Sequence, residues 1–329
     1  DDDKLKDIGF IPEAKFQNML SEIQIKRKWF LEAEKREEKK INKIILKKLT
    51  LQNIACFSEV SIDFDERITC LIGENGTGKT SILRAIAIAI AGTDETDLID
   101  TDSDKIKSLL RIIGQKGADA KFADKGDIEL SYETDKMYHN NIVFEDKGLK
   151  GVNIADGAES AFAATDGELL KCLVLAFPQN QDKTQEPIYL RRIDEPNLGD
   201  LLPVIYGTPD ERLELFSDWI LRLYNIYTDN FAKGKKTDEL KLIKEIFQII
   251  SEITGDNVRF KTINVEENSI WITTKDAPIG IMLRLVSEGY QNIIGWIGYF
   301  MMRLQKANPS MTNFREANAI LIMDEIDTY

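Results

Sequence analysis

The stretch GENGTGKT, residues 73–80, fits the pattern G-x-x-x-x-G-K-[ST] and decides the fold expected for the whole chain. The apolar, β-prone residues 67–72 (RITCLI) predict a strand before it, and residues 81–92 (SILRAIAIAIAG) predict a helix after it. In that order, a glycine-rich loop can turn its backbone N–H groups onto a phosphate chain, and the helix N-terminus adds positive charge. A plain glycine turn between a strand and a helix is the alternative.

Each polar side chain of the loop receives an expected role. Lys79 would reach the β- and γ-phosphates of a nucleotide, and the Thr80 hydroxyl would bind Mg²⁺. The residues expected to contact the nucleotide here are Gly73, Asn75, Gly76, Thr77, Gly78, Lys79, Thr80 and Ser81.

A second signal lies in residues 319–329 (AILIMDEIDTY), where an apolar strand leads directly into acidic residues. A parallel strand of an α/β sheet that delivers a carboxylate at its C-terminal end commonly builds a site there. Asp324 would hold Mg²⁺ through water, and Glu325 would orient or deprotonate the attacking water. Ordinary turn formation by acidic residues is the alternative.

Composition limits the classes of protein. The 329 residues include 43 Lys plus Arg and 56 Asp plus Glu, for a net charge of −13. No apolar run approaches the roughly 20 residues that cross a bilayer, so we expect no membrane partner. Three cysteines (Cys56, Cys70, Cys172) are odd in number, and without a secretory signal we expect free thiols in a reducing cytoplasm. The basic residues 26–48 fit either a solvated helix face or a nucleic-acid contact.

Periodicity predicts the remaining elements. They are a charged helix in 13–40, strands in 43–57 and 59–65, an acidic turn in 93–104, a hairpin of 126–133 with 140–146, a mobile loop in 147–167, a strand in 169–181, helices in 210–228 and 237–254, and a hairpin in 257–274. Apolar stripes in the two helices predict core seams, formed by Leu213, Phe216, Ile220 and Leu223, and by Leu240, Ile243, Phe247 and Ile250.

A third signal is SEGYQ, residues 287–291, at the start of an apolar helix where Ser287 would also suit a simple N-cap. The order of the three motifs resembles the ATP-binding-cassette (ABC) ATPase heads of the SMC, RecF and OLD branch, which carry an S-x-G-x-Q signature before the acidic strand. The resemblance implies ATP as the nucleotide and a head-to-head homodimer, or a higher homo-oligomer. In it Ser287 and Gly289, with Gln291, contact ATP bound to the other subunit. It also implies a glutamine that senses Mg²⁺ and water, for which Gln179 is the first choice and Gln181 the second, with an ordinary polar loop as the alternative.

The resemblance implies an α/β P-loop NTPase fold: an ABC ATPase head with a mixed sheet, N-terminal antiparallel strands and a short helical insertion. The expected parts are a charged lead-in (1–41), an N-terminal lobe with the phosphate loop (42–182), a helical and hairpin insertion (183–275) and a C-terminal lobe with the signature and Walker B strand (276–329). Because only residues 180–286 separate Gln179 from Ser287, the long coiled-coil arms of SMC proteins are excluded.

Residues 49–87 resemble the entry of RecF- and OLD-type heads, and residues 287–297 together with 321–329 are similar to the PtuA-type ATPases of the Septu antiphage system and their relatives in retron operons. This similarity implies bacterial defence and an associated nuclease of the HNH type (PtuB-like). It also admits a bound nucleic acid, or a retron reverse transcriptase with its RNA–DNA product. The alternative is a RecF- or SMC-like repair ATPase that clamps duplex DNA, which would require a basic surface that the net charge does not favour.

One departure concerns the histidine switch that the family carries after the acidic strand. The sequence ends at Tyr329, and its only histidine, His139, lies far upstream. Residues 1–329 also contain no metal-ligand cluster, HNH-like histidine pair or nucleophile triad, so DNA cleavage is expected from a partner or from residues beyond these.

Overall fold

The computed structural model describes residues 44–91, 109–116, 119–133, 137–146, 152–155, 172–178, 198–207, 212–307, 314 and 317–324. The chain separates into two compact units, Asp1–Lys43 and Ile44–Tyr329, and every described residue belongs to the second. The helix predicted in 13–40 and the acidic turn predicted in 93–104 lie outside the described residues.

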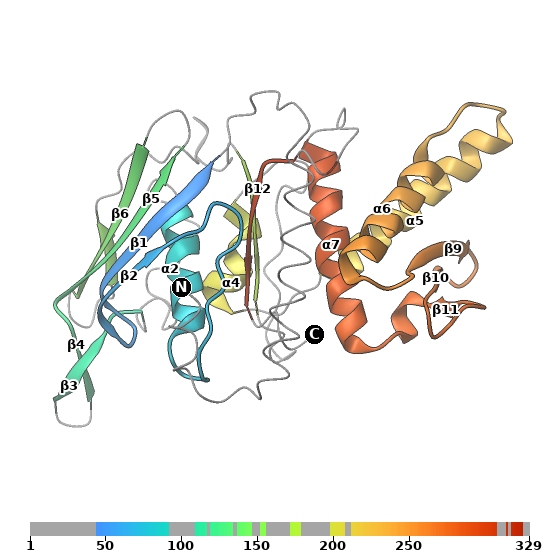
Figure 1. The fold of residues 1–329 in the computed structure, drawn as a ribbon. Coiled ribbons are helices and arrows are strands. Elements are labelled where there is room, and N and C mark those ends of the chain that lie inside the picture. Colours follow the sequence, from blue (N-terminus) through green and yellow to red (C-terminus); the bar gives the residue numbers. More distant parts are fainter. Residues whose placement is uncertain are drawn as a thin grey trace. The chain divides into compact units, whose positions relative to one another are not determined.

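A five-stranded antiparallel sheet in the order β2-β1-β5-β6-β7 forms one layer (Figure 1). Its strands are β1 (Ile45–Ile54), β2 (Phe57–Asp63), β5 (Lys125–Glu133), β6 (Met137–Asp146) and β7 (Val152–Ala155). The predicted strands in 43–65 and the hairpin of 126–146 are confirmed. The period-two alternation of these strands places apolar side chains such as Leu49 and Leu51 on the buried face of the sheet. The loop predicted for 147–167 is wrong at β7, which pairs antiparallel with the open edge of β6.

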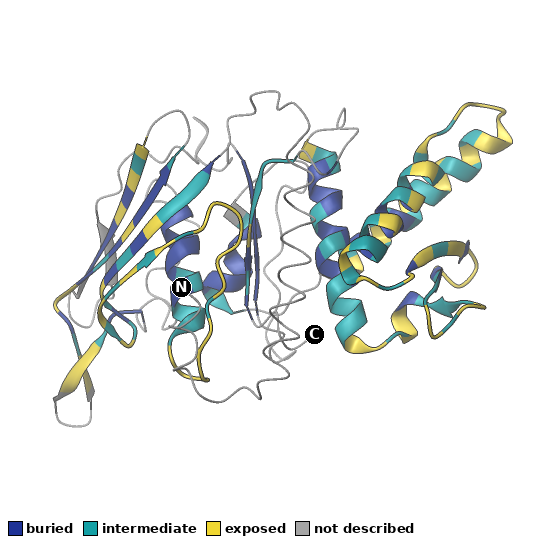
Figure 2. Ribbon diagram, viewed as in Figure 1, coloured by how far each residue is buried: buried dark blue, intermediate teal, exposed yellow. Residues whose placement is uncertain are grey.

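Helix α2 (Lys79–Ala91) packs against this sheet (Figure 1). Eight of its residues, from Ile82 to Ala91, are buried, which explains a sequence apolar on nearly every side (Figure 2). Asn140 of β6 donates from Nδ2 to the Ala89 carbonyl at 2.8 Å and accepts from Tyr132 Oη at 3.0 Å. The first bond ties the helix to the sheet, and the second holds the Asn140 amide from the neighbouring strand β5.

A separate parallel pair joins β8 (Leu173–Phe177) to β12 (Ala319–Met323), in the register Ala319 opposite Leu173. Both strands were predicted as apolar runs, and β8 is buried along its whole length. The Asp324 N–H donates to the Phe177 carbonyl at 3.0 Å and so continues the ladder past the strand. The α/β fold class is confirmed. The mixed sheet expected from the sequence is not formed among the described residues, because the antiparallel and parallel strands lie in separate sheets.

The strand predicted at residues 67–72 is wrong. No strand is formed there, and Ile68 and Ile72 are about half exposed, at 49% and 51%. Local bonds form instead: Asp65 N–H donates to Thr69 Oγ1 at 3.0 Å, and Arg67 N–H donates to Asp65 Oδ1 at 3.1 Å. Such side-chain bonds compete with a sheet ladder.

In the described part of the chain, the core consists of two clusters of buried apolar side chains. The first includes α2 and the five-stranded sheet, and the second is built around three helices: α5 (Arg212–Ala232), α6 (Glu239–Thr254) and α7 (Glu288–Ala307). The predicted helices in 210–228 and 237–254 are confirmed, and the buried members of their seams are Phe216, Ile220, Ile243, Phe247 and Ile250. A three-stranded sheet in the order β11-β10-β9 contributes to the same cluster. Its strands β9 (Arg259–Asn264) and β10 (Ser269–Thr273) form the predicted hairpin, and β11 (Ile281–Met282) pairs with β10.

Shorter elements complete the described chain. An exposed hairpin of β3 (Ile112–Lys116) and β4 (Asp119–Phe122) was not predicted. A 3-10 turn, η2 (Leu198–Asp200), precedes α4 (Leu202–Tyr206), and a second, η3 (Leu283–Leu285), precedes α7. No helix within the described segments is long and apolar enough to cross a membrane.

The cysteines differ in environment. All three are free thiols; Cys56 and Cys70 are exposed, whereas Cys172 is buried. Burial raises the pKa of the Cys172 thiol to about 12, so this group stays protonated at neutral pH and packs as a small apolar residue.

Gly298 allows α7 to approach α5 closely. A Cβ at this position would lie 2.7 Å from ring carbons of Phe216. We expect Gly298→Ala to lower the free energy of unfolding by about 1–3 kcal/mol, because the added methyl overpacks the core. Urea unfolding of the variant measures this difference.

Helix propensity alone predicts the opposite sign, since alanine is favoured over glycine by about 1 kcal/mol in a helix. A more stable variant would therefore contradict the close packing. As a control, Phe216→Leu should make room for the methyl, so that the two substitutions together cost less than the sum of their separate effects.

Candidate nucleotide site

The turn between β1 and β2 holds the glycine-rich loop in place. Asn53 at the end of β1 and Ala55 in the turn have left-handed backbones, with φ of 52° and 51°. Gly78 itself has φ of +95°, and a Cβ there would lie 2.6 Å from both Cys56 Sγ and a ring carbon of Phe57. Only glycine meets both the backbone and the space requirement at this position.

Hydrogen bonds within the loop define its closed conformation. Lys79 Nζ donates to the carbonyls of Gly73 and Glu74 at 2.7 and 2.9 Å. Thr77 Oγ1 also donates to the Glu74 carbonyl, at 2.8 Å. The lysine ammonium is therefore folded back over the loop, directly beside the N-terminus of α2, where positive charge and N–H groups attract an anion.

Asp324 joins the loop to the opposite end of the sequence. Thr80 Oγ1 donates to Asp324 Oδ2 at 2.8 Å, although the two residues are 244 positions apart. The Asp324 residue is only 3% exposed and is held by its backbone at the C-terminal end of the β8–β12 pair. A hydroxyl and a carboxylate are hard oxygen ligands that suit Mg²⁺, which keeps several waters and phosphate oxygens as its other ligands.

Arg84 is a basic residue near this site that the sequence did not single out. It lies one helical turn after Thr80 on α2, and its Nε donates to the Val204 carbonyl of α4 at 3.3 Å. Burial lowers the pKa of Arg84, and the negative charge of Asp324 opposes that shift. The i, i+4 spacing from Thr80 was the signal available in the sequence.

The signature residues stand at the start of α7. The Ser287 carbonyl accepts the first helical hydrogen bond from Gln291 N–H at 3.0 Å, as expected for an N-cap position. Gln291 Nε2 donates to the carbonyls of Arg284 and Val286 at 3.1 and 2.8 Å, and Tyr290 Oη donates to Asp256 Oδ2. Within the chain, therefore, the Gln291 side chain binds the backbone that leads into α7. Its predicted contact with a nucleotide stays a prediction.

Several predicted site residues are not described. Gln179, Gln181 and Glu325 lie outside the described residues, so their roles remain predictions. Within the described part of the chain, no group of three or more His, Cys, Asp or Glu side chains is arranged to hold a metal. His139 contacts Ser131 Oγ at 3.0 Å and Glu129 Oε1 at 3.3 Å, both through Nδ1, so it does not bridge a nucleophile and an acid through its two nitrogens.

Comparison with known proteins gives the following similarities. A family model described as an AAA domain matches residues 48–270. The chain is 31% identical over 203 residues to the DNA double-strand break repair Rad50 ATPase of Nanoarchaeum equitans, covering 61% of this chain and 23% of that protein. It is 20% identical over 296 residues to the Septu protein PtuA of Bacillus thuringiensis, covering 87% of this chain and 65% of that protein.

Among solved structures, that of the recombination mediator protein RecF with ATP aligns over 89% of this chain and 88% of its own, with 11% identity and a TM-score of 0.39. The chain thus spans about a quarter of the Rad50 relative and just under two thirds of the PtuA relative.

Proposed function

The chain belongs to the AAA domain family, and on that premise we propose that it binds ATP with Mg²⁺ at the glycine-rich loop and hydrolyses it. The observation that carries the proposal is the 2.8 Å hydrogen bond between Thr80 and Asp324. It unites the phosphate loop with the acidic strand, the two parts that phosphoryl transfer requires side by side.

Each residue of the site has a role in the proposed reaction. The loop N–H groups and the N-terminus of α2 bind the phosphate chain, and the Lys79 ammonium leaves the Gly73 and Glu74 carbonyls to bind the β- and γ-phosphates. Thr80 and Asp324 would hold Mg²⁺, which when bound neutralises charge on the phosphate oxygens. Glu325, the next residue in the chain, is the proposed base that orients the attacking water.

We further propose that two subunits close head to head around ATP, with Ser287 and Gly289 of one subunit at the γ-phosphate held by the other. The glycine at the start of α7 supports this, since a helix N-terminus with little side-chain bulk suits an anion. ATP then favours the closed dimer because only that state offers it both surfaces.

For the biological role, we propose control of a nuclease partner in antiphage defence, which is supported by the similarity to PtuA across most of the chain. A repair function on duplex DNA is the second candidate, supported by the similarity to the Rad50 ATPase. Purification of the protein from its native operon separates the two. A co-purifying nuclease favours defence, and a lone ATPase that shifts linear duplex DNA in a gel favours repair.

Mixed subunits test the composite site. We expect Lys79→Met and Ser287→Arg variants each to be inactive alone. A freely exchanging equal mixture should recover about a quarter of wild-type ATPase activity, because half of its dimers contain one intact site of two. Phosphate release measured at constant total protein reports the recovery.

No recovery in the mixture, with both variants folded and exchanging, would mean that each subunit completes its own site. Subunit exchange is verified by affinity-tagging one variant and recovering the other with it. A sample of each variant alone at the same total concentration supplies the baseline.

A further inference from the structure

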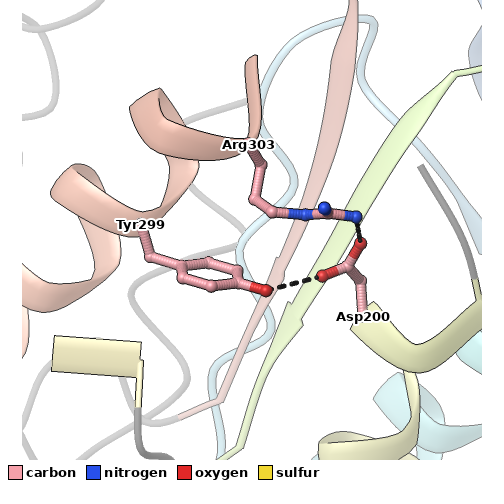
Figure 3. Close-up of polar contacts among 3 residues, drawn as sticks. All are labelled: Asp200, Tyr299 and Arg303. Carbon is pink, nitrogen blue, oxygen red and sulfur yellow. Dashed lines mark hydrogen bonds and ion pairs between the residues drawn. The ribbon is translucent and has the colours of Figure 1, made fainter. Parts of the chain in front are cut away.

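The Asp200 carboxylate binds two side chains of the signature helix α7. Tyr299 Oη donates to Asp200 Oδ1 at 3.0 Å, and Arg303 Nη2 lies 2.5 Å from Asp200 Oδ2. Figure 3 shows both side chains reaching from α7 to the same carboxylate. Because Tyr299 and Arg303 are spaced i, i+4, they project from one face of the helix.

This network is fully buried. Asp200 and Tyr299 are 0% exposed, and Arg303 is 1% exposed. Buried charged hydrogen bonds are short and directional, and removing one partner is strongly unfavourable because the other keeps its charge away from water. The network therefore fixes the position of α7 relative to η2, whereas a purely apolar contact would allow the helix to shift along its axis.

Asp200 is also tied to the phosphate-loop helix. It ends η2, and only Leu201 separates it from α4, whose residues Leu202, Val204 and Ile205 are buried in the same core cluster as α2. Arg84 of α2 donates to the Val204 carbonyl at 3.3 Å. The segment 198–206 thus bonds to α2 at Val204 and to α7 at Asp200.

The contacts of segment 198–206 lie on the same two helices as the two halves of the proposed site, the phosphate loop and the signature. Arg84 lies one turn after Thr80, at the phosphate loop, while Tyr299 lies twelve residues after Ser287, about 18 Å along the helix axis at 1.5 Å per residue. A continuous α-helix transmits the position fixed at Tyr299 and Arg303 to its N-terminal signature.

We propose that Asp200 is a positioning residue that sets the signature helix at a defined place relative to the phosphate-loop helix, with Arg84 anchoring the other end of the segment 198–206. This inference rests on the proposed head-to-head dimer. In such a dimer two loops and two signatures must meet two ATP molecules at once, so their spacing within each subunit decides whether both sites close.

The test uses Asp200→Asn, which keeps the shape and removes the charge, and Tyr299→Phe, which removes one hydrogen bond and keeps the ring. We expect both to bind mant-ATP within about threefold of wild type, since Lys79, Thr80 and Asp324 are untouched. ATP-driven dimerisation and kcat should fall at least tenfold in Asp200→Asn and less in Tyr299→Phe. Arg303→Lys, which keeps the charge, should retain more activity than Arg303→Met.

A core variant controls for loss of stability alone. Ile128→Val in β5 shortens a fully buried side chain of the sheet, and it should lower the melting temperature without changing kcat measured well below that temperature. Wild-type dimerisation and kcat in Asp200→Asn would overturn the inference. So would a fall in kcat that disappears on cooling.

A measurement without ATP keeps the inference separate from the proposed function. Spin labels on Lys48 of the sheet and Ala307 of α7, with Cys56 and Cys70 replaced by serine, report the distance between the two parts. We expect a narrow distribution in the otherwise unchanged protein and a broader one with Asp200→Asn. An unchanged distribution would overturn the positioning role, whereas an inactive wild type with a broadened variant would overturn only the ATPase proposal.

Discussion

Replacing Lys79 with methionine is expected to lower ATP hydrolysis at saturating ATP by at least about a hundredfold, the usual cost of removing one donor that stabilises transition-state charge. Methionine keeps most of the apolar stem and removes the ammonium that now donates to Gly73 and Glu74. Those carbonyls are exposed to water, so the fold should lose little stability. Steady-state phosphate release and thermal unfolding together measure the two effects.

Lys48→Met is the matched control, because Lys48 is an exposed lysine of β1. It should hydrolyse ATP at the wild-type rate. If Lys79→Met retained more than a tenth of wild-type kcat while remaining folded, Lys79 would not be the phosphate ligand and the loop would serve as a turn.

Asp324→Asn should raise the Mg²⁺ concentration for half-maximal activity by about tenfold to a hundredfold, the range found when a group that supports a bound metal is changed. The amide oxygen can still accept the Thr80 hydrogen bond, so the local geometry should survive. What is lost is the negative charge that would face the metal and that opposes the lowering of the Arg84 pKa by burial. Titration of ATPase activity with Mg²⁺ at fixed ATP measures the change.

Asp276→Asn provides the control, since Asp276 is exposed in the connection between β10 and β11. Its Mg²⁺ dependence should match that of the wild type. An Asp324→Asn protein with unaltered Mg²⁺ dependence would place the metal ligand elsewhere, and Thr80 would then be bound to a purely structural carboxylate.

These two predictions probe opposite halves of one site. Lys79 comes from the loop that the sequence motif identifies, whereas Asp324 depends on the β8–β12 pair for its position. A large effect of Lys79→Met with no effect of Asp324→Asn would support ATP hydrolysis at the loop with the metal ligand elsewhere than Asp324.

Patterns that are local in the sequence were predicted well. The glycine loop and the start of α2 follow from eight consecutive residues, and the seams of α5 and α6 follow from helical spacing, because both depend on neighbours within a few positions. The same reasoning failed at residues 67–72, where an apolar composition predicted a strand. A strand exists only if another strand pairs with it, and composition carries no information about that partner.

The sequence by itself determined the phosphate-loop motif, the apolar strand that ends at Asp324, and most helices and strands, since backbone propensity and side-chain periodicity act over short distances. The tertiary structure alone decided which distant groups meet: Thr80 with Asp324, Arg84 with Val204, and Asp200 with Tyr299 and Arg303. Each of these contacts joins residues about a hundred or more positions apart. They form only because burial of the two apolar clusters brings those backbones together, and a buried polar group must then find its partner there.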